Sequence, residues 1–152
     1  SKLYSFGRKN PKNPMTGGFV EESISSGLYF LNPRIECRLY SLEVPECCYE
    51  RVKEQIQLFY KNKDIYRYSL LGLFTCAANI PLDRKHAYFC SQFVADVLQK
   101  SGVNLFDKHP SLVRPADFIY HNKLQLEYEG FIHELYQYIP KTKQNIEIQT
   151  CV

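Results

Sequence analysis

The chain has 152 residues, of which 45% are hydrophobic and 23% charged, so it fits one globular domain with a core of its own. Its net charge of +3 is small and its lysines and arginines are scattered, which argues against a nucleic-acid-binding protein. No apolar run approaches the roughly 18 residues of a membrane-spanning helix, and no signal peptide begins at Ser1. We therefore expect a cytoplasmic protein without a membrane span.

The first elements in chain order are a short strand over Leu3–Phe6 and a loop over Gly7–Gly18, which is rich in glycine, proline and asparagine. Phe19–Leu31 shows no clean period. Glu36–Val44 alternates and predicts a strand, whose more apolar face carries Arg38, Tyr40, Leu42 and Val44.

Proline is well tolerated at the start of a helix, and Pro45 is followed by a helical pattern. The apolar positions fall at helical spacing, and we expect the helix to end near Lys61 and Asn62. These positions are Cys48, Val52, Ile56 and Phe59.

Tyr68–Ile80 is the most apolar stretch of the chain and predicts a buried helix. Within it, we expect the helix to run over Leu70–Ala78. The segment before it, Tyr66–Tyr68, is expected to be extended. A polar connection follows over Pro81–His86. Cys90–Lys100 then predicts a strong helix that ends at Gly102. Its buried stripe consists of Phe93, Val94, Val97 and Leu98.

The last third of the chain predicts a loop over Asp107–Ser111, a short helix over Pro115–Phe118 and a hairpin. The hairpin strands are Leu124–Tyr128 and Phe131–Leu135, on either side of Glu129 and Gly130. From Pro140 the chain is polar and is expected to be loosely held. Because the helices are grouped between strands, we expect an α+β fold with an antiparallel sheet packed against helices.

The six cysteines do not have the spacing of a disulfide framework, and no CxxC pair suggests zinc, so we expect reduced thiols, no metal and no cofactor. Most of them are expected to play no chemical part. Cys37, Cys48 and Cys76 are interpreted as packing residues, Cys47 as a surface residue and Cys151 as a tail residue.

Cys90 is the exception, because it begins a predicted helix. The unpaired N–H groups and the positive end of the helix dipole favour a thiolate there, so we expect a lowered pKa and a nucleophile. The backbone N–H of Ser91 is a candidate donor to an oxyanion. The competing interpretation is that Cys90 is a small buried apolar residue.

Two stretches resemble a known family. FCSQFVADVLQKSGV at Phe89–Val103 is similar to the catalytic-cysteine helix of circularly permuted NlpC-type papain-like cysteine amidases and peptidases, in the YiiX/YaeF-like branch. YSFGRKNPKNPMTGGFVEE at Tyr4–Glu22 resembles the opening strand and loop of a bacterial branch of that family. LVRPADF at Leu112–Phe118 and YEG at Tyr128–Gly130 also fit, so the resemblance extends over roughly Tyr4–Leu135.

The resemblance implies a single papain-like domain over residues 1–152 and a thiol hydrolase or acyltransferase. Its substrate would be a small peptide, a peptidoglycan amide or a lipid-like amide or ester, cleaved through an acyl-enzyme on Cys90. The family places its histidine on a strand that would precede Ser1, so we expect this chain to lack that strand, and the residues encoded before Ser1 would show whether such a histidine exists.

None of the four histidines matches the family position. His86, His109 and His121 are interpreted as surface residues and His133 as structural. The family's third polar residue would lie on Leu3–Phe6, where Ser5 is the candidate, with Glu21 and Glu22 as alternatives.

Three hypotheses remain: a cysteine amidase or esterase, a non-catalytic binding module that has lost its base, and an interaction protein in which Cys90 is inert. The enzyme hypothesis predicts that Cys90 reacts with iodoacetamide at acidic pH faster than the other cysteines do.

Overall fold

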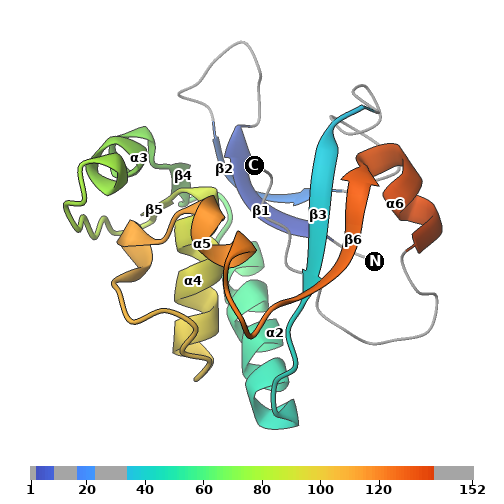
Figure 1. The fold of residues 1–152 in the computed structure, drawn as a ribbon. Helices are drawn as coiled ribbons and strands as arrows, with labels where there is room; N and C mark the ends of the chain where they lie inside the picture. Colours follow the sequence, from blue (N-terminus) through green and yellow to red (C-terminus); the bar gives the residue numbers. More distant parts are fainter. Residues whose placement is uncertain (1–2, 9–16, 23–33, 139–152) are drawn as a thin grey trace.

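The computed structural model describes residues 3–8, 17–22 and 34–138. Figure 1 shows helices α3, α4 and α5 on one side of β1, and the β3–β6 pair with α6 on the other. In chain order the elements are β1 (Leu3–Arg8), β2 (Gly17–Glu22), β3 (Glu36–Ser41), α2 (Glu46–Lys61), β4 (Arg67–Tyr68), α3 (Leu70–Ala77), β5 (Ala87–Tyr88), α4 (Cys90–Lys100), the 3-10 turn η1 (Pro110–Leu112), α5 (Pro115–Ile119), β6 (Gln125–Phe131) and α6 (Ile132–Tyr138).

The described strands form three two-stranded sheets, so the chain is an α+β protein, as expected. The β1–β2 and β3–β6 pairs are antiparallel, but β4 and β5 run parallel. Parallel strands need a crossover connection, and α3 is that crossover. The expected antiparallel pairing is therefore found in two of these sheets, and the parallel β4–β5 pair was not predicted.

A cluster of aromatic rings at the centre of the molecule joins the β1–β2 pair to the helices. The ring of Phe6 on β1 lies 5.1 Å from Phe93 of α4 and 5.9 Å from Phe59 of α2. Leu3, on the opposite side of β1, contacts Ile132 at the start of α6. Strand β1 thus packs against the α2–α4 core with one face and against α6 with the other.

The two long helices confirm their sequence patterns. In α2 the buried side chains are those of Cys48, Val52, Ile56 and Phe59, and the helix ends at Lys61. The predicted stripe of α4 is also buried, and Gly102 follows its end with a φ of +86°, a conformation that favours glycine.

The glycine-rich segment was predicted as a loop as far as Gly18, but Gly17 and Gly18 begin strand β2. These two glycines permit a close approach to β4. A Cβ atom on Gly17 would lie 2.6 Å from the Cβ of Tyr68, and one on Gly18 would lie 2.5 Å from the carbonyl oxygen of Tyr66. Residues 9–16 lie outside the described part of the chain.

Strand β3 ends at Ser41 instead of Val44, and its buried face is the opposite of the predicted one. Leu39 is buried against Tyr128 and Leu135, whereas Arg38 is exposed and pairs with Glu129 at 2.5 Å. The register shifts between Leu39 and Tyr40, and such an irregularity interrupts simple alternation.

The predicted C-terminal hairpin was wrong. Residues Gln125–Phe131 form one continuous strand, β6, which pairs with β3, and Ile132 begins helix α6. Gly130 does not mark a turn: a Cβ atom there would lie 2.5 Å from the Oη of Tyr128. The glycine makes room for the tyrosine ring within the strand. The segment after Pro140 lies outside the described residues.

Helix α3 forms as predicted, but it is not buried. Gly72 and Cys76 face the interior, whereas Leu71 is 52% and Phe74 72% exposed. The inner side of α3 packs near η1, and no described element covers the outer side that carries Leu71 and Phe74.

Candidate active site around Cys90

Cys90 is the first residue of α4, where the sequence placed it. The preceding residue, Phe89, has extended backbone angles, and no side chain caps the helix. The N–H groups of the first turn are therefore not taken by a capping side chain. The thiol is half-buried.

Burial raises the pKa of the Cys90 thiol, while the backbone N–H groups of Ser91 and of Cys90 itself act in the opposite direction. The net direction is upward. The expectation of a lowered pKa was therefore wrong, because the effect of burial on the Cys90 thiol is larger than that of the backbone N–H groups at the start of the helix. The thiol is the favoured form at neutral pH.

The start of α4 is held firmly by its surroundings. Phe89 is buried, and a Cβ atom on Gly72 of α3 would lie 3.1 Å from its ring. The buried hydroxyl of Ser91 donates a hydrogen bond of 2.7 Å to the carbonyl oxygen of Val113. The Ser91 side chain thus anchors the helix, which leaves its backbone N–H as the group available near the sulfur.

All four histidines make contacts other than with Cys90. His109 Nδ1 accepts a hydrogen bond from the Ser111 N–H, and His133 Nε2 lies 3.8 Å from Glu134. His121 is half-buried, which corrects its assignment to the surface, with its Nε2 2.6 Å from the Leu105 carbonyl oxygen.

His86 is exposed, as expected, and its ring packs against Tyr66. The chain between His86 and Cys90 passes through β5 and an extended Phe89. Along four residues of extended chain, the Cα atoms of His86 and Cys90 lie about 13 Å apart. At that distance the imidazole of His86 cannot take the proton of the Cys90 thiol without a relay.

Ser5 lies on β1 but belongs to the face opposite Phe6, because successive side chains of a strand alternate. Since Phe6 packs on α4, Ser5 faces away from the helix that carries Cys90. Glu21, opposite Tyr4 in the β1–β2 pair, is exposed. The structure does not bring either residue to the sulfur, and the side chain of Glu22 lies outside what it describes.

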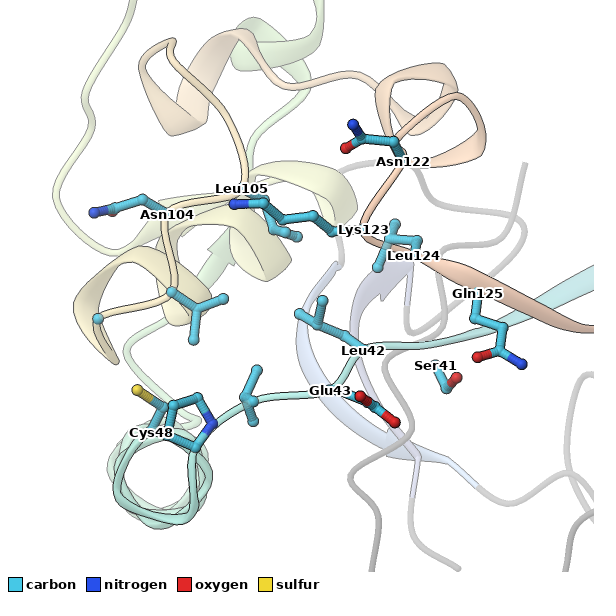
Figure 2. Close-up of a pocket in the computed structure, with 14 residues that line it drawn as sticks. Ser41, Leu42, Glu43, Cys48, Asn104, Leu105, Asn122, Lys123, Leu124 and Gln125 are labelled. Carbon is cyan, nitrogen blue, oxygen red and sulfur yellow. The ribbon is translucent and has the colours of Figure 1, made fainter.

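A cavity in the described part of the chain lies away from Cys90. It has a volume of about 530 Å³ and is lined by residues after β3, after α4 and before β6, including Leu42, Asn104 and Lys123 (Figure 2). Cys48 of α2 also borders it. It adjoins the C-terminal end of α4, about 16 Å of helix away from Cys90. Sequence reasoning missed it because its walls are connecting segments without a motif.

The described residues contain no group of three or more histidine, cysteine or acidic side chains placed to hold a metal ion. No described helix combines the length and the apolar character needed to cross a membrane. No family model matches the chain, and neither a curated protein nor a solved structure matches it significantly. The assignment of a function depends on the geometry around Cys90 and on the resemblance given above.

Proposed function

We propose that the chain carries the nucleophile of a papain-like thiol hydrolase or acyltransferase, with Cys90 as that nucleophile. The Cys90 thiolate would attack the carbonyl carbon of an amide or ester and form a thioester. The amine or alcohol would leave with a proton, and water or an acceptor would then take the acyl group. A small peptide, a peptidoglycan amide or a lipid-like ester are the candidate substrates.

The observation that carries the proposal is the position of Cys90 at the uncapped start of α4, where the residue is partly exposed and the rest of the helix packs against the core. The N–H groups of Cys90 and Ser91 approach the sulfur, so they are suited to receive negative charge there. The hydrogen bond from Ser91 to Val113 keeps this geometry rigid.

The alternative is a binding module on the same fold that has lost its base. Two observations favour it: the pKa of Cys90 is raised, and the four histidines are engaged elsewhere. The enzyme therefore requires a proton acceptor other than these histidines.

Acylation by an activated ester, p-nitrophenyl acetate, distinguishes the two functions when the full chain is used with and without added imidazole as an external base. We expect an acetyl group on Cys90, located by peptide mass mapping, and turnover that increases with imidazole after the hydrolysis by imidazole alone, without protein, is subtracted. Cys90→Ala should abolish both effects. Cys47→Ala removes an exposed thiol of α2 and serves as the matched control, which should change neither.

Turnover that persists in Cys90→Ala, or an acetyl group that appears on Cys47 alone, would rule out Cys90 as the nucleophile. A chain whose Cys90 is neither acetylated nor assisted by imidazole, yet remains folded, would support the binding module.

A further inference from the structure

The outer face of α3 is an apolar surface that the fold leaves uncovered. Of the large hydrophobic residues exposed in the described chain, four lie within one short segment, with Phe74 72%, Ile80 56% and Leu71 52% exposed and Leu73 beside them. Figure 1 shows α3 at the outer edge of the molecule. No charged residue occurs from Tyr68 to Leu82. We refer to Leu71, Leu73, Phe74 and Ile80 as the α3 face.

The α3 face is built rigidly. Asn79 adopts a φ of +57°, the Asn79 N–H donates to the carbonyl oxygen of Cys76, and the Ile80 N–H donates to that of Thr75. This left-handed termination of a helix fixes Ile80 beside the last turn. The exposed side chains are therefore presented by an ordered element.

Polar backbone groups at both ends of α3 also have hydrogen-bond partners. The buried Ser69 hydroxyl accepts a hydrogen bond from the Gly72 N–H. At the other end, the Arg114 guanidinium donates to the carbonyl oxygens of Cys76 and Ala77, at 3.1 and 3.4 Å. A helix with satisfied ends can leave water at a lower cost than one with open carbonyl groups.

The charges next to the α3 face are mainly basic. Arg84 and Lys85 follow the apolar segment, and both side chains are exposed. Neither residue forms an ion pair within the described residues. The one acidic residue beside them in the sequence is Asp83. An apolar surface with a basic border is complementary to an anionic lipid surface.

The size of the surface argues in the same direction. A stable protein interface buries about 800 Å² on each partner, which is more than four side chains of one short helix provide. A second copy of the chain would also bring like charges together. Lipid binding needs only a few apolar side chains that enter the boundary between headgroups and acyl chains, assisted by basic residues.

We propose that the α3 face docks the protein on an anionic phospholipid bilayer, with Phe74 and Leu71 entering the boundary and with Arg84 and Lys85 contacting the headgroups. This interaction does not depend on the chemistry of Cys90. Phe89 packs on Gly72, which is on the inner side of α3, so the helix would lie between a docked bilayer and the start of α4.

The chain contains no tryptophan, so a single introduced one reports its own surroundings. Phe74→Trp in the full chain, mixed with vesicles of phosphatidylcholine and phosphatidylserine, should show a blue-shifted emission that reverts at high salt. Leu58→Trp replaces a residue of α2 that is 49% exposed, and it is the matched control that should show no shift.

The double variant Arg84→Gln with Lys85→Gln should weaken binding to these vesicles about thirtyfold. The control double variant, Lys61→Gln with Lys63→Gln, should change vesicle binding little.

Equal shifts at positions 74 and 58, or equal binding to phosphatidylcholine alone, would overturn the proposal. A concentration-dependent dimer in sedimentation that Phe74→Ser abolishes, without any vesicle binding, would assign the α3 face to a second copy and overturn it as well. Cys90→Ala should still bind vesicles, because docking does not depend on the Cys90 thiol. The docking proposal can therefore be tested independently of the catalytic one.

Discussion

The sulfur of Cys90 is subject to two opposing influences. The N–H groups at the start of α4 stabilise a thiolate, whereas burial of the side chain stabilises the neutral thiol. The effect of burial on the pKa is the larger of the two. The position of the cysteine could be predicted from the helical pattern that follows it. Its degree of burial could not, because that depends on β5, α3 and the segment around Val113.

This balance predicts the pH dependence of alkylation. A raised pKa means that less thiolate is present at a given pH than in a free cysteine, whose pKa is about 8.5. The midpoint of the rate of Cys90 alkylation by iodoacetamide should therefore lie above that value in the folded chain. In urea, the same residue should return to it. A midpoint in the folded chain below that of the unfolded chain would contradict the prediction and restore the expectation of an activated thiolate.

At the scale of elements, helices were easier to predict than strands. The apolar spacing in α2 and α4 reports burial directly, because each helix has one face on the core. Strand β6 was mistaken for the end of a hairpin because Gly130 is a common turn signal. Its actual role, to make room for Tyr128, depends on a contact within the folded strand.

Gly130→Ala tests this role. The added methyl group should displace Tyr128, whose hydroxyl donates a 2.9 Å hydrogen bond to the carbonyl oxygen of Phe131, and should lower the free energy of unfolding by about 1–3 kcal/mol. Gly7→Ala is the control within a strand, because its nearest neighbour would be Ser5 Oγ at 3.8 Å. Urea denaturation of both variants gives the comparison, and equal effects would show that Gly130 makes no special room.

At the scale of the whole molecule, one aromatic cluster connects the β1–β2 pair to the helices. Phe6 is almost completely buried, and its ring lies within 5.9 Å of five other aromatic rings. These rings come from β2, α2, the segment before β4, β5 and α4. Such a cluster contributes both apolar burial and edge-to-face contacts.

Phe6→Ala should therefore lower the free energy of unfolding by about 3–5 kcal/mol. Hydrogen exchange should show the largest loss of protection in β1 and β2, which lose their main attachment to α4. Tyr120→Ala, at a side chain that is 86% exposed, should change stability by no more than about 0.5 kcal/mol. A similar loss in the two variants would mean that the aromatic cluster is not what attaches the β1–β2 pair.

The sequence by itself determined the features that depend on local signals: the bounds of α2, the start of α4 at Cys90 and the α+β class. The helical spacing of apolar residues and the residues that end a helix are local signals of a few positions. They can be recognised without knowing which distant segments pack against the helix. Only the tertiary structure decided the buried face of β3, the exposure of α3 and the direction of the pKa of Cys90. Each of these depends on which distant segments exclude water from a side chain, and no local pattern specifies that.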